Sequence, residues 1–145
     1  MKYLDYYYGA YGSNLNKEQM QRRCPNAIAI GAFDLIGQKL TFRGVADIEK
    51  SRGCSIQLGI WQITKRCEIA LDIYEGFPNF YTKMFVPHHT FGQIMIYTMQ
   101  NKETICPPSN GYLDSISQGY KYFELDPSSL KEAVKDSYLR QTPVF

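Results

Sequence analysis

The clearest alternation of apolar and polar residues lies in the middle of the chain. In residues 54–64, Ile56, Leu58 and Ile60 occupy every second position. A period of two places them on one face of an extended chain, so we predict a strand there. The spacing changes directly afterwards to that of a helix, which we expect over residues 65–74.

Elsewhere the pattern predicts strands and helices in mixed order. Further strands are expected at residues 2–11, 27–42, 81–87 and 91–99, and further helices at 15–24, 112–122 and 127–139. The glycines at positions 31 and 37 interrupt the second of these strand regions, which indicates bent or bulged strands. Asn14 or Asn16 is expected to cap the first helix. Residues 44–53 are polar and are expected to form a loop.

This order of elements favours a particular fold class. Hairpin-like connections between successive strands argue against a doubly wound parallel sheet. We therefore expect an α+β protein whose sheet curls into a small mixed β-barrel flanked by helices, since mid-strand glycines permit such curvature. With 145 residues and no internal linker, the chain is expected to form a single domain over residues 1–145.

Composition and charge exclude several classes of function. The net charge of +2 comes without any long basic run, so no nucleic-acid partner is expected. The longest basic pair, Arg22 and Arg23, is expected on a solvated helix face. No signal peptide or membrane-length apolar run is visible, which predicts a cytoplasmic protein without a membrane partner. The four cysteines form no C-x-x-C pair, so we expect reduced, mostly buried thiols and no metal site.

The turn after the first predicted strand is a candidate binding site. Gly12, Ser13 and Asn14 separate the strand from the helix that follows. Such a turn exposes consecutive backbone N–H groups beside the positive end of a helix, and these donors can bind a carboxylate or a phosphate. A capped turn without any ligand explains the same residues.

A glutamate at the wrong end of a helix is the candidate for chemistry. Glu75 closes the helix predicted before Gly76, where the partial charge of the helix is negative, and Tyr74 and Phe77 flank it. Both features disfavour the carboxylate anion and would raise the pKa of Glu75 toward that of a useful general acid and base. The alternative is a side chain that points into water. Asp72 lies on a similar helix face, and we expect it to cap a neighbouring loop.

Taken together, these segments resemble the gamma-glutamyl cyclotransferase-like family. The matching motifs occur in order along the chain and are Tyr11–Leu15, Arg23–Pro25, Gly59–Ile63, Leu71–Pro78 with Tyr81, and Pro108–Ser109 with Tyr112, Ile116 and Gly119. The resemblance implies a small mixed barrel flanked by helices. It also implies that Glu75 is the catalytic carboxylate. By the same match, the substrate-binding residues would be Tyr11, Gly12, Ser13, Asn14, Leu15, Tyr81 and Tyr112.

The implied reaction converts a gamma-glutamyl amine or peptide into 5-oxoproline and the free amine. The substrate's own alpha-amine is the nucleophile, so neither a cofactor nor a metal is expected. The expected partner is a small gamma-glutamyl molecule, whose leaving group stays open, as does the oligomeric state. The alternative function is a non-catalytic module of the same fold that binds a small anionic metabolite in the turn.

Overall fold

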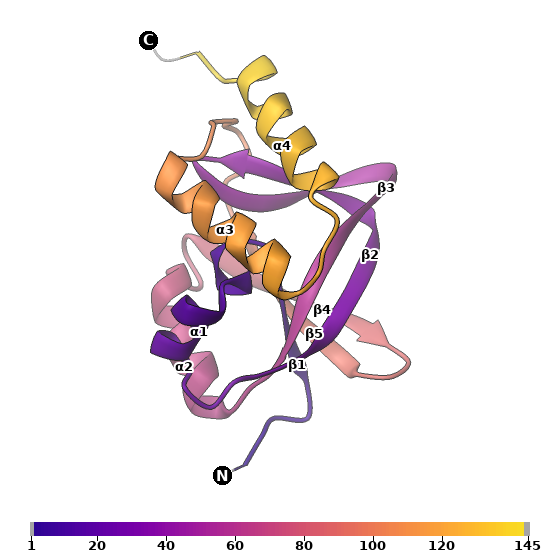
Figure 1. Ribbon diagram of the computed structural model, residues 1–145, viewed down its shortest axis with the longest axis vertical. Helices are drawn as coiled ribbons and strands as arrows, with labels where there is room; N and C mark the ends of the chain where they lie inside the picture. The colour runs from indigo at the N-terminus through magenta and orange to yellow at the C-terminus, as the bar shows by residue number, and fades with distance from the viewer. Residues whose placement is uncertain (1, 144–145) are drawn as a thin grey trace.

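A computed structural model describes residues 2–143, and it shows a curled, five-stranded mixed sheet flanked by helices (Figure 1). The strands are β1 (Tyr7–Ala10), β2 (Ile28–Arg43), β3 (Val45–Gln62), β4 (Tyr81–His88) and β5 (Gly92–Met99). The helices are the short 3₁₀ helix η1 (Ser13–Leu15), α1 (Lys17–Arg23), α2 (Lys65–Glu75), α3 (Asn110–Tyr122) and α4 (Ser128–Leu139). The predicted α+β class, with a curled sheet flanked by helices, is confirmed. The predicted domain limits at residues 1 and 145 lie outside the described residues.

The short strand β1 lies at the centre of the sheet. The strand order is β2-β3-β1-β5-β4, with β1 antiparallel to β3 and parallel to β5. The predicted first strand, residues 2–11, is longer than β1, and before β1 only an isolated bridge from Tyr3 to Thr64 continues the pairing within the described chain. Because β1 leads directly into η1, the candidate binding turn emerges from the middle of the sheet rather than from its edge.

Strands β2 and β3 form one long hairpin that turns at Gly44, whose φ of 81° suits a glycine. The prediction of a loop over residues 44–53 is therefore wrong, because residues 45–53 belong to β3. One polar residue of this region, Asp47, is fully buried and paired, whereas Lys50 and Arg52 are exposed on the strand. Arg43 Nε donates to Asp47 Oδ2 at 2.8 Å, and both side chains are almost completely buried.

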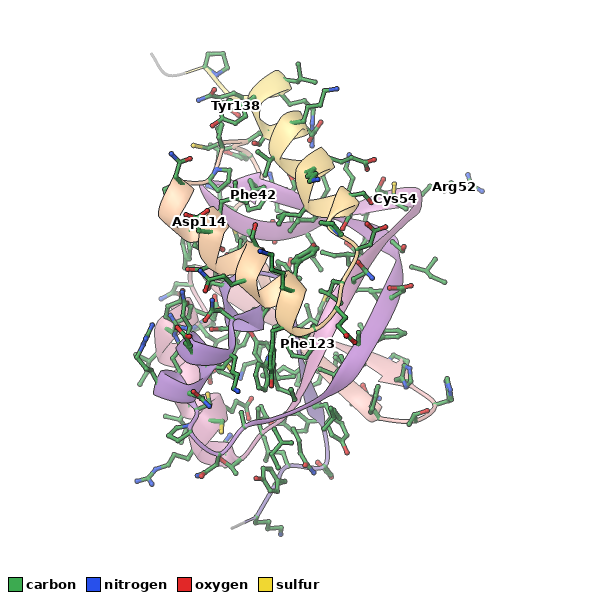
Figure 2. The ribbon with its side chains drawn as sticks, viewed as in Figure 1. Phe42, Arg52, Cys54, Asp114, Phe123 and Tyr138 are labelled. Atoms are coloured by element: carbon green, nitrogen blue, oxygen red, sulfur yellow. The ribbon has the colours of Figure 1, made fainter. Side chains whose placement is uncertain are left out.

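The predicted bends in the second strand region are present within a single continuous strand. Gly31 and Gly37 have φ values of 152° and 88°, and the pairing of β2 with β3 shifts at both places. Such bulges bend a strand and increase its twist, which helps the sheet to curl around its core. Figure 2 shows Arg52 and Cys54 at the outer bend of β3, far from the interior.

The remaining elements lie close to their predicted positions. Helix α1 begins two residues later than expected and is capped by Asn16, whose Oδ1 accepts from the Gln19 amide at 3.1 Å. Helices α2, α3 and α4 and strands β4 and β5 agree with their predicted bounds to within two residues. Among residues 2–143, no helix has the length and apolar character needed to cross a membrane.

Close packing between η1 and α3 positions the turn against the rest of the fold. Leu15 is fully buried beside Gly59 and Gly119. A Cβ atom on Gly119 would lie 2.4 Å from the Leu15 Cβ and 2.6 Å from its carbonyl carbon, far inside contact distance. Helix α3 can therefore approach the turn only because position 119 has no side chain.

Candidate active site

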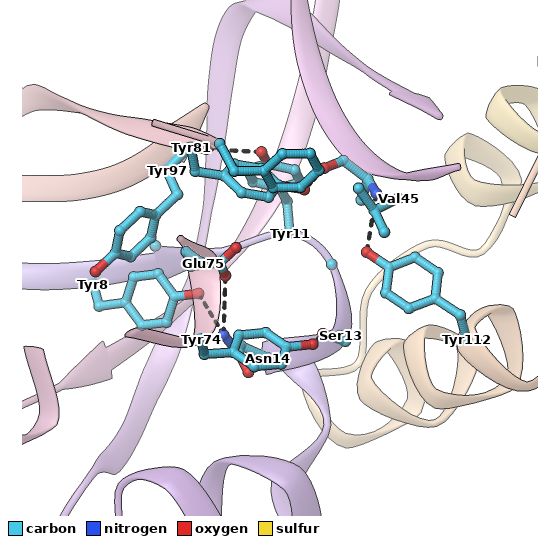
Figure 3. Close-up of a pocket in the computed structure, with 14 residues that line it drawn as sticks. Tyr8, Tyr11, Ser13, Asn14, Val45, Tyr74, Glu75, Tyr81, Tyr97 and Tyr112 are labelled. Carbon is cyan, nitrogen blue, oxygen red and sulfur yellow. Dashed lines mark hydrogen bonds between the residues drawn. The ribbon is translucent and has the colours of Figure 1, made fainter. Parts of the chain in front are cut away.

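A cavity of about 180 Å³ lies between β1, the η1 turn, the beginning of β3, the end of α2 and the start of α3 (Figure 3). Its lining residues are Tyr8, Gly9, Tyr11, Gly12, Ser13, Asn14, Val45, Ala46, Tyr74, Glu75, Phe80, Tyr81, Tyr97 and Tyr112. The fold thus brings Glu75 together with six of the seven predicted binding residues. Leu15 is the exception, since its side chain packs in the core and does not line the cavity.

Glu75 is the last residue of α2, and its carboxyl group points into the cavity (Figure 3). Gly76 ends the helix with a left-handed φ of 65°, which a glycine adopts without strain. Burial raises the pKa of Glu75 from 4.5 to about 7, although the charge of Arg23 acts in the opposite direction. The Glu75 side chain is half-buried, so the alternative of a group pointing into bulk water does not describe this structure.

The turn opposite Glu75 presents unused backbone donors. The Leu15 amide donates to the Gly12 carbonyl at 3.1 Å, and the Asn16 amide donates to the Ser13 carbonyl at 3.0 Å. By contrast, the amides of Gly12, Ser13 and Asn14 make no hydrogen bond to any residue of the described chain. All three of these residues line the cavity, so their amides, unlike that of Leu15, are the candidate donors to a ligand.

The Asn14 side chain connects the turn to Glu75. Its Nδ2 atom donates to the Tyr8 hydroxyl at 3.1 Å and, over a longer 3.4 Å, to Glu75 Oε1. Its Oδ1 atom accepts from Arg23 Nη1 at 2.8 Å. The Asn14 carbonyl accepts from Trp61 Nε1 at 2.9 Å, which ties the turn to β3. The side-chain amino group of Asn14 is therefore directed toward the cavity.

Six tyrosines line the cavity together with Glu75. Two of them, the predicted Tyr81 and Tyr112, hold the β3 backbone between them. The Tyr81 hydroxyl donates to the Ala46 carbonyl, while the Tyr112 hydroxyl accepts from the Ala46 amide at 2.9 Å. The Tyr11 hydroxyl donates to the Tyr97 carbonyl at 2.7 Å. Burial raises the pKa of each of these four phenols well above its usual value, so all are neutral at physiological pH.

Sequence reasoning missed several residues at this site. Tyr8, Tyr74 and Tyr97 line the cavity. The Tyr-rich composition is the one signal for Tyr8 and Tyr97, while Tyr74 stands out in the sequence as a neighbour of Glu75. Arg22 is exposed as expected, but the prediction of a solvated face is wrong for Arg23, which is half-buried and packs its guanidinium 3.5 Å from the centre of the Tyr74 ring.

Asp72, which was expected to cap a loop, has another role. Its carboxylate accepts from Lys83 Nζ, with the closer oxygen at 2.9 Å, and from the Tyr97 hydroxyl. Lys83 also contacts Glu68 at 2.6 Å, so this cluster fastens α2 to β4, and none of the three charged residues lines the cavity. Among residues 2–143, no three His, Cys, Asp or Glu side chains converge as metal ligands would. Of the four free cysteines, two are buried as expected, and Cys54 and Cys106 are exposed.

Comparison with known proteins adds independent information. No protein-family model matches the sequence. A Bos taurus protein named gamma-glutamylcyclotransferase is 29% identical in a 137-residue alignment that covers 79% of this chain and 69% of the bovine protein.

Solved structures point to the same group. One described as gamma-glutamyl cyclotransferase is 27% identical, with a TM-score of 0.74, and the match covers 96% of this chain and 89% of that one. A Homo sapiens protein described as uncharacterized is 28% identical, with a TM-score of 0.75 and the same coverage. Sequence and fold together support the predicted resemblance of this chain to the gamma-glutamyl cyclotransferase-like family.

Proposed function

We propose that the protein is a cyclotransferase that converts a gamma-glutamyl amine or gamma-glutamyl peptide into 5-oxoproline and the free amine. The observation that carries this proposal is the poorly solvated Glu75 carboxyl group, which faces the unused amides of the Gly12–Asn14 turn across one small cavity. The names of the bovine relative and of one similar solved structure support the same reaction.

Substrate binding would use the turn and the tyrosine wall. The amides of Gly12, Ser13 and Asn14 are suited to hold the alpha-carboxylate or the developing oxyanion of the glutamyl group. A cavity of about 180 Å³ is smaller than the roughly 300–1,000 Å³ typical of sites for drug-sized ligands. This size favours a compact glutamyl group, with the leaving amine directed toward the partly exposed Tyr74 and Phe80 at the rim.

The reaction requires one bond to form and one to break. The alpha-amine nitrogen attacks the gamma-carbonyl carbon, and the carbonyl electron pair moves onto oxygen. Before the attack, Glu75 accepts the proton whose loss converts the alpha-ammonium group into the free amine. When the tetrahedral intermediate collapses, a second proton passes from the attacking nitrogen to the leaving nitrogen and the C–N bond to the leaving amine breaks. Glu75 then returns its proton to the released amine. The attack is intramolecular, which corresponds to effective molarities of about 10⁵ M or more when the geometry is held.

The pKa of Glu75 suits this proton transfer. An alpha-amino group titrates near about 8, so a carboxyl group with a pKa of about 7 accepts its proton at a cost of about 1.4 kcal/mol. At its ordinary pKa of 4.5, the same carboxyl group would face a mismatch of about 5 kcal/mol. Burial of Glu75 therefore removes most of the thermodynamic obstacle to the first step.

A panel of gamma-glutamyl amines and peptides, scored for 5-oxoproline, tests the proposal. We expect turnover by the unmodified protein and a loss of about 10²- to 10⁴-fold in the Glu75→Gln variant, the usual contribution of acid–base catalysis. Glu103→Gln removes an exposed carboxylate outside the cavity and serves as the matched control. Calorimetry that detects binding of these compounds without any 5-oxoproline would instead identify the protein as a non-catalytic binding module.

A further inference from the structure

Arg23 joins three parts of the site although it does not line the cavity itself. It is the last residue of α1. Its Nη1 atom donates to Asn14 Oδ1 at 2.8 Å and to Gln19 Oε1 at 3.1 Å, while its guanidinium stacks on the Tyr74 ring of α2. The Tyr74 hydroxyl in turn lies 3.0 Å from the Ser13 hydroxyl. One side chain thus connects the binding turn with the end of the helix that carries Glu75.

The guanidinium decides which way the Asn14 amide faces. Arginine can only donate hydrogen bonds, so the Asn14 atom beside it must be the oxygen. The amino group of Asn14 is then directed to the other side, toward Glu75 Oε1 and the Tyr8 hydroxyl. If the amide were reversed, its oxygen would face the Glu75 carboxylate, with two acceptors in contact. Arg23 therefore disfavours the reversed orientation of the Asn14 side-chain amide.

Arg23 is also the one full charge among the ionisable groups that interact electrostatically with Glu75 in the described part of the chain. These groups come from β1, β4, β5, α1, α3 and the turn, and they are Tyr8, Tyr11, Tyr81, Tyr97, Tyr112 and Arg23. Burial raises the pKa of all five phenols, which are therefore uncharged. The guanidinium opposes the effect of burial and lowers the pKa of Glu75.

We infer that Arg23 is a positioning residue of this site: it holds the Asn14 amino group toward Glu75 and braces the end of α2 through Tyr74. The inference rests on the proposed function for its catalytic consequence. Its structural part, the orientation of Asn14 beside Glu75, exists without a substrate and can be measured separately.

A double-mutant cycle tests whether Arg23 acts through Asn14. We expect Arg23→Met to lower kcat/KM by about 10- to 100-fold, the effect of losing one charged hydrogen bond. If Arg23 works in part through Asn14, combining Arg23→Met with Asn14→Ala lowers kcat/KM by less than the product of the two single losses. Full multiplication of the two losses would overturn the inference. Arg22→Met, at the exposed neighbouring position of the same helix, serves as the control with unchanged activity.

A titration without substrate separates this inference from the proposed function. Carbon-detected NMR can follow the Glu75 carboxyl group, assigned by its absence in Glu75→Gln. We expect its pKa to rise in Arg23→Met, to stay near the unmodified value in Arg23→Lys, and to stay unchanged in Arg22→Met. An unchanged Glu75 titration in Arg23→Met would overturn the inference even if 5-oxoproline is formed. If no gamma-glutamyl compound is converted while the titration moves as expected, only the proposed function fails.

Discussion

Replacing Glu75 with glutamine is expected to stabilise the folded protein at neutral and alkaline pH, although it removes the proposed acid–base group. Glutamine keeps the shape of the side chain and cannot ionise. The pKa of Glu75 is about 7 in the folded protein, against an ordinary value of 4.5, chiefly because the carboxyl group is desolvated. The native state therefore holds the protonated form over a pH range in which the unfolded chain has already released its proton.

The sign and the size of the effect follow from this difference. A raised pKa of a carboxyl group means that its favourable contribution is complete below about pH 4.5 and is lost as the pH rises through about 7. A pKa difference of about 2.5 corresponds to about 3 kcal/mol in full. Between about pH 5 and about pH 8.5, the stability of Glu75→Gln relative to the unmodified protein should grow by about 2.5 kcal/mol.

Urea unfolding at several pH values measures this difference directly. The unmodified protein, Glu75→Gln and the exposed-site control Glu103→Gln should be compared with the slopes of the unfolding transitions checked for agreement. A stability difference between Glu75→Gln and the unmodified protein that stays flat across this range would refute the argument, because it would mean that Glu75 is as well solvated in the folded state as in the unfolded chain. The mechanism would then lose its matched proton acceptor.

Two further substitutions test how the site is held in place. Gly119→Ala should destabilise the protein by at least about 1–3 kcal/mol in urea unfolding, since its Cβ would lie 2.4 Å from that of Leu15. The control Gly111→Ala, in the same helix, meets no neighbour within 4 Å and should be neutral or slightly stabilising. Equal effects of the two substitutions on stability would contradict the close approach of α3. Lys83→Met should cost about 3 kcal/mol, because it removes the cation beside Asp72 and the closer of the two cations beside the buried Glu68. Lys65→Met removes the more distant cation, from a side chain that is 71% exposed, and should cost at most about 1 kcal/mol. Similar losses in both lysine variants, measured in the same assay, would show that the buried cluster does not fasten α2.

The sequence by itself determined the features that depend on neighbouring residues. Alternation at Ile56, Leu58 and Ile60 identified a strand. Asn16, one of the two residues expected to cap α1, is its cap. Gly76 placed Glu75 at the end of a helix. These signals are local: side-chain periodicity, capping and the left-handed conformation of glycine act within a few residues along the chain. The same local interpretation failed at residues 44–53, where a strand that carries the buried Asp47 and the exposed Lys50 and Arg52 was predicted as a loop.

Only the tertiary structure decided what Glu75 faces. Asn14 and Glu75 are 61 positions apart, and neither periodicity nor composition specifies that the end of α2 approaches the turn after β1. That approach results from long-range packing, with β1 inserted between β3 and β5 and α3 held against η1 at Gly119. The same packing turned Arg23 inward, beside Asn14 and Tyr74. Desolvation of a carboxyl group depends on all of its neighbours in space, so the raised pKa of Glu75 is a property of the fold, while the glutamate at the helix end is a property of the sequence.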